Sequence, residues 1–253
     1  MPWRSNHIEH ALEVFVRGFS ADKSRTHPYE FARVGRAWLM RDAPRKNPRD
    51  YRKEEWVAYG VPAREIDAAA RKMTRGRFFV CAVRGMDEPE EPLRTSYKEL
   101  GYRLLSTEPL FVHRLKKIPR AANPIAIERV TTPEMAVRFG KATRTRPIPS
   151  EKLAKDAPFR QFVALDGKKL IGWVRSVDAG DSTWCSNMYV SPSHRRRGIG
   201  SALLCHMLRD DRRRGFQQSV LLSSHAGALV YPRVGYEQIG LLYIFAPPKR
   251  KKT

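Results

Sequence analysis

The apolar residues in the first part of the chain fall into short groups separated by charged stretches. From Ile8 to Phe19 they recur at intervals of three and four residues, which predicts an amphipathic helix. A similar spacing from Phe31 to Leu39 predicts a second helix, and the charged, proline-bearing stretch 41–55 is predicted to be a surface loop. Pro62 is expected to open a helix that ends near Met73. Strands are predicted at 78–83, 102–105 and 110–115.

Beyond position 124 the pattern changes to short apolar runs divided by turn residues. The segment 125–129 is predicted to be a strand, and 132–142 a helix capped by a threonine. Asp166-Gly167 is a dipeptide typical of a tight hairpin, and a further reversal precedes a strand at 183–190. This part of the chain is therefore predicted to start with a strand and a helix and to continue as an antiparallel meander.

Length and composition indicate a globular protein. The chain has 253 residues, of which 42% are hydrophobic, enough for one large domain or two small ones. Since no apolar stretch approaches the roughly 18 residues that cross a bilayer and no secretory signal opens the chain, we expect a cytoplasmic protein without a membrane partner. Its three cysteines lack metal-ligand spacing. They are predicted to be buried, reduced thiols, and no metal is expected.

The charge of the chain is strongly positive. Lys and Arg number 48 against 26 Asp and Glu, a formal net charge of +22, with basic runs at 195–197, 212–214 and 249–252. Such a charge attracts anions, but nucleic acid, acidic protein, anionic lipid and a polyphosphate cofactor all share that sign. The tail 249–253 is expected to be a solvated terminus, with a targeting or nucleic-acid patch as the alternative.

A basic, glycine-bearing loop follows the strand at 183–190. Ser191-Pro192 ends the strand, and Gly198-Ile199-Gly200 precedes an amphipathic helix that starts at Ser201 and stops at Gly215. A helix N-terminus after glycines favours phosphate, because its unpaired N–H groups and its dipole both attract anions. A strand at 219–223 comes next, so strand, helix and strand are predicted to form a crossover between parallel strands.

The frame around this loop resembles a known family. Two other phosphate motifs are absent, since there is no G-x-x-x-x-G-K-[ST] and Leu203 stands where a dinucleotide fingerprint needs its third glycine. The segment 190–204, V-S-P-S-H-R-R-R-G-I-G-S-A-L-L, is similar to the [QR]-x-x-G-x-[GA] motif of the GNAT N-acetyltransferase superfamily. The segment 228–236, A-L-V-Y-P-R-V-G-Y, resembles the short helix and strand that close the same fold. The resemblance covers roughly the last half of the chain.

The resemblance implies an α+β fold with a mixed, mostly antiparallel central sheet flanked by helices, preceded here by a second α/β half. It also implies that acetyl-CoA inserts between the strands at 183–190 and 219–223. The backbone N–H of Met188 would face the thioester carbonyl and stabilise the oxyanion, a donor worth roughly 3 to 4 kcal/mol of barrier, while Val190 would pair with the pantetheine. The implied acetyl-CoA-binding residues are Met188, Tyr189, Val190, Arg195, Arg196, Arg197, Gly198, Ile199, Gly200 and Ser201.

The implied reaction is direct attack of a neutral amine on the thioester, so that neither Cys185 nor Cys205 is a nucleophile. Tyr231 matches the phenol that protonates the departing thiolate, with a packing role as the alternative. Pro232 departs from the family pattern and is expected to distort or end the short helix that carries Tyr231.

The general base is not specified by this pattern. Trp184 occupies the position where family members often hold a carboxylate, and no Asp or Glu lies between 183 and 190. An ordered water, His225, Glu151, Asp178 or an already neutral substrate amine could serve instead.

A short motif of the last half, two tyrosines five residues apart with a glycine before the second, also occurs in the first half. Tyr97-Lys-Glu-Leu-Gly-Tyr102 matches the spacing of Tyr231-Pro-Arg-Val-Gly-Tyr236. Chance is one account, because a helix that ends in glycine before a strand is common. The other account, which we favour, is a tandem, degenerate acyltransferase half without a pyrophosphate loop, which would pack and form one wall of the acceptor site. The expected domains are 1–118, a linker at 119–124, an acetyltransferase domain at 125–248 and the tail 249–253.

Three functions fit these observations. The leading hypothesis is an acetyl-CoA-dependent N-acetyltransferase that acts on an amine of a small molecule or protein. A nucleic-acid-associated basic binding protein is one alternative, disfavoured because aromatic and basic residues are not interleaved as in RNA-binding strands. A non-catalytic acyl-CoA sensor is another, disfavoured by the presence of Tyr231.

Overall fold

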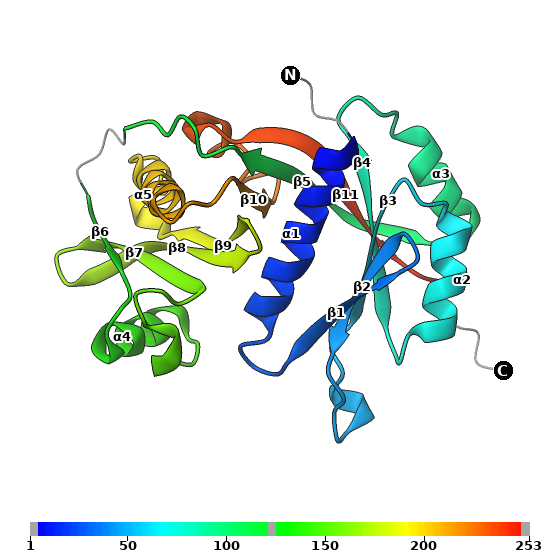
Figure 1. Ribbon diagram of the computed structural model, residues 1–253, viewed down its shortest axis with the longest axis horizontal. Helices are drawn as coiled ribbons and strands as arrows, with labels where there is room; N and C mark the ends of the chain where they lie inside the picture. Colours follow the sequence, from blue (N-terminus) through cyan, green and yellow to red (C-terminus); the bar gives the residue numbers. More distant parts are fainter. Residues whose placement is uncertain (1–4, 121–124, 249–253) are drawn as a thin grey trace. The chain divides into compact units, whose positions relative to one another are not determined.

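The computed structural model describes residues 5–120 and 125–248, which fall into two compact units (Figure 1). The first unit takes in the described residues up to Phe111 together with 222–226 and 238–248. The second unit takes in 112–221, apart from 121–124, together with 227–237. Neither unit is therefore one continuous stretch of chain.

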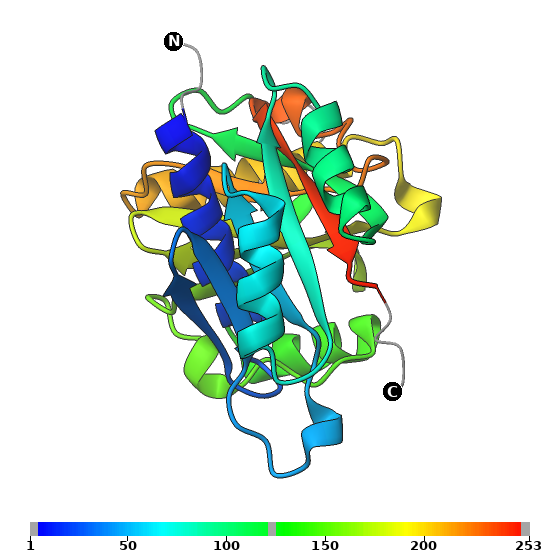
Figure 2. The same ribbon diagram turned by 90° about the vertical axis from the view of Figure 1, so that its right-hand side faces the viewer.

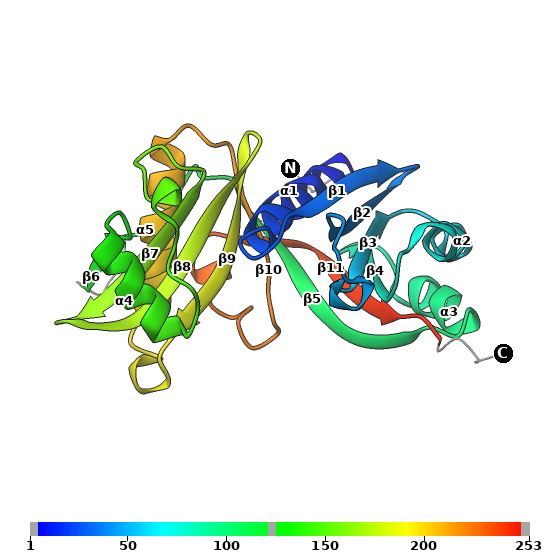
Figure 3. The same ribbon diagram turned by 90° about the horizontal axis from the view of Figure 1, so that it is seen from below.

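The first unit is built on a mixed sheet with the strand order β1-β2-β3-β4-β11-β5. The β3 and β4 strands are parallel, whereas β1 with β2, β2 with β3, and β11 with β4 are antiparallel. Helix α1 packs on one face, and α2 and α3 lie on the other (Figures 2 and 3). The elements are α1 (Ser5–Lys23), β1 (Tyr29–Val34), β2 (Ala37–Asp42), a 3-10 turn (Pro48–Asp50), β3 (Glu54–Tyr59), α2 (Ala63–Met73), β4 (Phe78–Gly85), α3 (Glu91–Glu99), β5 (Arg103–His113) and β11 (Glu237–Ala246).

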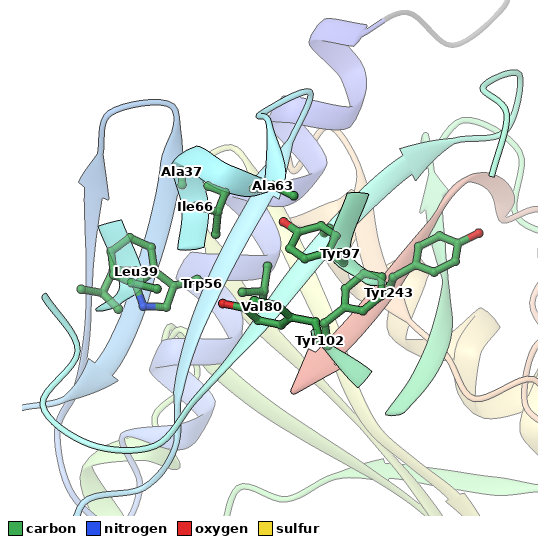
Figure 4. Packing of buried hydrophobic residues seen from close by; sticks show 13 residues of the cluster. Ala37, Leu39, Trp56, Ala63, Ile66, Val80, Tyr97, Tyr102 and Tyr243 are labelled. Atoms are coloured by element: carbon green, nitrogen blue, oxygen red, sulfur yellow. The ribbon is translucent and has the colours of Figure 1, made fainter. Parts of the chain in front are cut away.

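An aromatic core joins α2 and α3 to this sheet (Figure 4). Trp56 is fully buried, and its indole N–H donates to the Thr74 hydroxyl at 3.0 Å. The Tyr97 ring of α3 stacks on Phe245 of β11 with centroids 4.4 Å apart. A strand from the C-terminal end of the chain is thus packed into the core of the first unit.

Three predictions for this half were wrong. The segment 31–39 is not a helix but part of the β1–β2 hairpin, because Gly35 adopts a left-handed φ of 58° that turns the chain. The loop predicted at 41–55 is shorter, because its first residues end β2 and its last residues begin β3, a strand that was not predicted. The two strands expected at 102–105 and 110–115 are one continuous strand, β5.

The second unit has the strand order β10-β9-β8-β7-β6. Only β9 and β10 pair in parallel within this unit; the other neighbours are antiparallel. Helix α5 packs on one face and α4 lies on the other (Figure 1). The elements are β6 (Ala126–Arg129), α4 (Pro133–Thr143), η2 (Ser150–Lys152), β7 (Phe159–Asp166), β8 (Lys169–Ala179), β9 (Ser182–Val190), η3 (Pro192–His194), α5 (Ile199–Arg213), β10 (Ser219–Leu222) and η4 (Pro232–Val234).

The strands and helices predicted for this half are confirmed. Thr132 caps α4 by accepting from the Met135 N–H at 3.3 Å, and Gly167 turns the β7–β8 hairpin with a φ of 53°. Gly215 follows α5 with a φ of 86°. Part of the expected linker, 121–124, and the tail 249–253 lie outside the described residues.

A buried ion cluster fixes α5 to the sheet of the second unit. Arg160 of β7 is fully buried, and its guanidinium donates to Asp211 near the end of α5 at 2.8 Å. Asp178 and Asp210 are further partners of Arg160. Asp211 also accepts from the hydroxyl groups of Ser176 at 2.7 Å and Thr183 at 2.9 Å. Three strands and one helix therefore share one charge network.

Removal of one buried partner should be costly. Asp211→Ala is expected to lower the free energy of unfolding by about 3 kcal/mol, because it leaves a buried cation short of a counter-charge. Urea denaturation measures this loss, and the exposed Glu13–Arg17 pair of α1 supplies the control, since Glu13→Ala should cost about 0.5 kcal/mol or less. Equal losses in the two variants would contradict the role given to the cluster.

Candidate acyl-CoA site

The parallel ladder between β9 and β10 is short. The paired residues are Ser219 with Thr183 and Val220 with Trp184. The ladder stops there, although β10 continues to Leu222 and β9 to Val190. The outer part of β9 therefore carries backbone groups that β10 does not pair.

A bulge in β9 lies just beyond the end of this ladder. Between the pairs Arg175–Ser186 and Trp173–Tyr189, β9 has one residue more than β8. Asn187 adopts a left-handed φ of 51° within this extra length. The bulge reorients the strand immediately before Met188.

Backbone N–H groups of β9 face the unpaired side. The N–H of Ser191 donates to the Ile171 carbonyl on the β8 side at 2.8 Å. Because successive N–H groups along a strand point in opposite directions, those of Val190 and Met188 point away from β8. Both therefore face the side where the β10 ladder has stopped. The family resemblance assigns these two amides to the pantetheine and the thioester.

The loop that joins the end of β9 to α5 has several backbone N–H groups outside regular structure. Arg196 and Gly198 adopt left-handed φ values of 62° and 75°, and Gly198 directly precedes α5. Alternation of this kind makes a concave array of N–H groups that suits an anion. The first N–H groups of a helix lack intrahelical partners, so Ile199, Gly200 and Ser201 extend the array. Arg195, Arg196 and Arg197 are exposed around it.

Gly200 lies in close contact with side chains of β9. A Cβ at this position would lie 3.1 Å from the Met188 methyl carbon and 3.8 Å from a Val190 methyl. The side chains of Met188 and Val190 thus point toward α5, whereas the Tyr189 ring stacks on Trp173 at 4.3 Å. Arg195 donates from Nε to the Val190 carbonyl at 3.0 Å and ties the loop to the strand end.

Tyr231 lies in a tight turn of the second unit. It immediately precedes η4, which begins at Pro232, so the proline starts this turn and does not interrupt a longer helix. The turn ends at Gly235, whose φ is 98°. Tyr231 is 6% exposed, and its ring packs edge-on against Tyr236 with centroids 5.7 Å apart. Tyr236 in turn hydrogen bonds to the Ser219 hydroxyl of β10 at 2.8 Å.

The sequence of this region matches a family model. Residues 158–238, from the start of β7 to the first residues of β11, match the Acetyltransferase (GNAT) domain. These residues form a GNAT acetyltransferase domain. The resemblance noted for the loop and the Tyr231 segment is confirmed by this match.

Several solved structures to which the chain is similar are described as GNAT proteins. A GCN5-related N-acetyltransferase from Kribbella flavida is 16% identical with a TM-score of 0.65, covering 96% of this chain and 95% of that chain. A second, from Sphaerobacter thermophilus, is 16% identical with a TM-score of 0.56, covering 96% and 94%. A tandem GNAT protein from the clavulanic acid biosynthesis pathway is 14% identical with a TM-score of 0.55, covering 100% and 99%. These likenesses show the GNAT fold.

Comparison with curated proteins gave no match. In the part of the chain that the structure describes, no helix is both long and apolar enough to span a membrane. Among the same residues, no group of three or more His, Cys, Asp or Glu side chains is arranged to hold a metal ion.

The first unit also contains a strand–helix–strand unit with parallel strands, but here the two strands stay paired along their length. Strand β3, helix α2 and the parallel strand β4 correspond in order to β9, α5 and β10. The β3–β4 ladder, however, runs without a break through six pairs, from Glu54–Phe78 to Tyr59–Val83. Three residues, Gly60 to Pro62, replace the long basic loop, and Glu65 in the first turn of α2 disfavours an anion.

The structure also gives the positions of the other sequence candidates. All three cysteines are free and buried, and burial raises the pKa of both Cys185 and Cys205, so neither thiol is activated. Asp178 belongs to the Arg160 cluster and is engaged as a counter-charge. Trp184 is buried in the sheet of the GNAT domain. His225 is exposed in the first unit, with Nε2 2.7 Å from the Thr107 hydroxyl. Glu151 lies in η2.

His113 was missed in the sequence, although it holds the Tyr231 turn. Its Nδ1 accepts from the Leu115 N–H at 2.9 Å, so Nε2 carries the proton that is donated to the Val234 carbonyl at 3.1 Å. A Cβ on Gly235 would lie 2.9 Å from Nε2. Burial lowers the pKa of His113, in spite of its backbone partners. A lone histidine before a basic stretch gives no local signal of this contact.

The lowered pKa of His113 predicts a dependence of stability on pH. The unfolded chain, with a histidine pKa near 6.5, binds the proton more readily than the folded chain, so stability is complete above about pH 7 and falls as pH drops through the lowered folded pKa. His113→Gln should reduce this slope, which is at most about 1.4 kcal/mol per pH unit for one group. Urea denaturation from pH 8 to pH 5 measures it.

His206 provides the comparison for this experiment. Its pKa is also lowered by burial, so it contributes a slope of the same sign. His113→Gln should therefore remove part of the slope, and the His113→Gln/His206→Gln double variant should remove more. A slope unchanged in His113→Gln would show that His113 is not held neutral.

Proposed function

We propose that the second unit binds acetyl-CoA beside β9 and transfers the acetyl group to an amine. The observation that supports this most is the early end of the β9–β10 ladder, which leaves the Met188 and Val190 amides facing an unpaired side. Acetyl-CoA supplies an activated acetyl thioester, a pantetheine arm with amides of its own and a pyrophosphate. Each of these groups has a matching partner in the residues described above.

The residues present fit the proposed ligand. An extended amide-bearing arm can add to an open strand edge through main-chain hydrogen bonds. The N–H array from Arg196 to Ser201, with left-handed residues at 196 and 198, suits a pyrophosphate. No acidic residue lies in the first turn of α5. Arg195, Arg196 and Arg197 add positive charge around the array.

In this proposal Met188 acts through its backbone. Its N–H donates to the thioester carbonyl oxygen and stabilises the negative charge that develops there during attack by the amine. The bulge at Asn187 aims this N–H, because it ends the regular β8–β9 register just before Met188. The Met188 side chain packs toward Gly200 and holds the strand against α5.

Tyr231 is proposed as the general acid. Its hydroxyl would pass a proton to the departing thiolate. The turn that carries it is fixed by Pro232, by the left-handed Gly235 and by the bond from His113 to the Val234 carbonyl. The amine attacks the thioester carbonyl directly: the C–N bond forms, the C–S bond breaks, and the proton that the amine loses passes to water. The buried thiols of Cys185 and Cys205 take no part in this step.

The first unit is proposed as a degenerate copy of the same domain. Its turn repeats that of Tyr231: the Tyr102 N–H donates to the Tyr97 carbonyl at 3.0 Å, as the Tyr236 N–H does to Tyr231 at 3.2 Å. The ring pairs are also alike, at 5.5 Å and 74° against 5.7 Å and 78°. The similarity to a tandem GNAT protein over the full chain supports this proposal.

Acetyl-CoA binding is expected to depend on Gly200. Gly200→Val should weaken binding by at least about tenfold, roughly 1.4 kcal/mol, because a branched side chain would crowd Met188 and Val190 and cover the first amides of α5. Calorimetric titration with acetyl-CoA measures the change. Ala68→Val, at an exposed position of α2, introduces the same side chain away from the site and should leave affinity unchanged. Unaltered affinity in Gly200→Val would overturn the proposed binding mode.

Catalysis is expected to depend on Tyr231 and not on Tyr97, which occupies the corresponding position in the first unit. Tyr231→Phe should lower kcat by about 10²- to 10⁴-fold with little change in acetyl-CoA affinity, because it removes the proton donor and keeps the ring. Thiol release across a panel of amino acids, polyamines, aminoglycosides and basic peptides first identifies a working acceptor. Tyr97→Phe is the matched control and should retain full kcat. Similar rates for the two variants would exclude Tyr231 as the acid.

A further inference from the structure

A cavity in the first unit lies outside the acyl-CoA site. It has a volume of about 310 Å³, within the range of small-molecule sites, roughly 300 to 1,000 Å³. It is formed where the end of α2, the start of β4 and the end of β11 come together. The lining residues are Lys53, Ala70, Arg71, Thr74, Gly76, Arg77, Phe78, Phe79, Ala246, Pro247 and Pro248.

The lining combines rings with cations. Phe78, Phe79, Pro247 and Pro248 offer flat apolar surfaces, and Lys53, Arg71 and Arg77 supply positive charge. No Asp or Glu is among the lining residues, all of which are described. The composition therefore favours a ligand with a planar apolar body and one anionic group.

Contacts within the first unit hold two of these cations in place. The Lys53 ammonium lies 4.1 Å from the centroid of the Phe79 ring, so its charge is kept at an aromatic surface. Arg71 donates from Nε to both carboxylate oxygens of Asp67, at 2.8 and 2.9 Å. Asp67 in turn accepts from the Tyr102 hydroxyl at 2.7 Å. The Arg71 guanidinium is thus positioned by a partner outside the lining.

Two of the three cations, Lys53 and Arg77, are not balanced by an ion pair. Across the described ranges 5–120 and 125–248, neither Lys53 nor Arg77 forms an ion pair with an Asp or Glu. An anionic group at the mouth of the cavity would meet both of them. Such a pair is worth more beside an apolar wall than in open water, because the local dielectric constant is lower.

We propose that this cavity binds a small aromatic carboxylate. The ring lies against Phe78 and the prolines, and the carboxylate faces Lys53 and Arg77. All lining residues belong to the first unit, so the proposal does not depend on acetyl-CoA binding by the second unit.

The test uses 2-naphthoate as the probe and the full chain in low-salt buffer. Calorimetric titration should show saturable binding at one site per chain. The uncharged 2-naphthamide should bind at least about tenfold more weakly, roughly 1.4 kcal/mol, because it keeps the ring and lacks the charge. Inorganic phosphate should not compete at millimolar concentration, since it has no apolar body.

Gly76 allows the cavity to be filled without backbone strain. It lines the cavity, a Cβ there would meet nothing within 4 Å, and its φ is not left-handed. Gly76→Leu should weaken 2-naphthoate binding by at least about tenfold. Lys53→Gln and Arg77→Gln should each weaken it about threefold or more, whereas Lys72→Gln, on an exposed position of α2 outside the lining, should have no effect.

Three results would overturn the proposal. These are the absence of saturable 2-naphthoate binding, equal affinity for the acid and the amide, and wild-type affinity in Gly76→Leu with a native melting temperature. If Gly76→Leu does not fold, the comparison of Lys53→Gln and Arg77→Gln with Lys72→Gln decides the question.

Discussion

The second unit is organised around a hydrogen-bond ladder that ends early. Backbone N–H groups are almost always paired, so the amides of a strand that leaves its neighbour bond to water or to a ligand. Strand β9 parts from β10 after Val220–Trp184, and the bulge at Asn187 follows at once. The loop amides at Arg196 to Ser201 are a second set of donors without partners in regular structure. The proposed ligand, an extended molecule with amides at one end and phosphates at the other, would pair with both sets.

In the first unit the corresponding parallel strands, β3 and β4, do not separate. Six consecutive pairs join β3 to β4, and three residues lead into α2. No strand edge is left for a ligand between these strands. In the second unit, by contrast, the β9–β10 ladder has two pairs, and the buried Arg160–Asp211 pair joins β7 to α5. The two units therefore differ less in topology than in where their polar groups find partners.

Local features could be predicted from the sequence, whereas long-range ones could not. The β7–β8 hairpin and the loop before α5 were predicted because glycine and turn residues mark them directly. The hairpin at 29–42 was mistaken for a helix because its apolar residues also fit a helical spacing. Partners of Arg160 lie 18 and 51 residues away, and His113 bonds to a carbonyl 121 residues away. Such polar pairs leave no periodic pattern. The family motif located the loop, but the bulge at Asn187 had no signal.

The repeated tyrosine turn is informative because packing alone does not explain it. The Tyr97 ring fills the core of the first unit, stacked on Phe245 and fully buried. Its hydroxyl has no hydrogen-bond partner among the described residues. An unsatisfied buried hydroxyl costs about 1 to 3 kcal/mol, so phenylalanine would serve the core better. A phenol at the corresponding place, followed by a glycine at the same spacing, agrees with the proposal that the first unit is a degenerate copy of the GNAT domain. In the second unit the matching phenol of Tyr231 lies in the GNAT domain, which also contains the short β9–β10 ladder and the basic loop before α5.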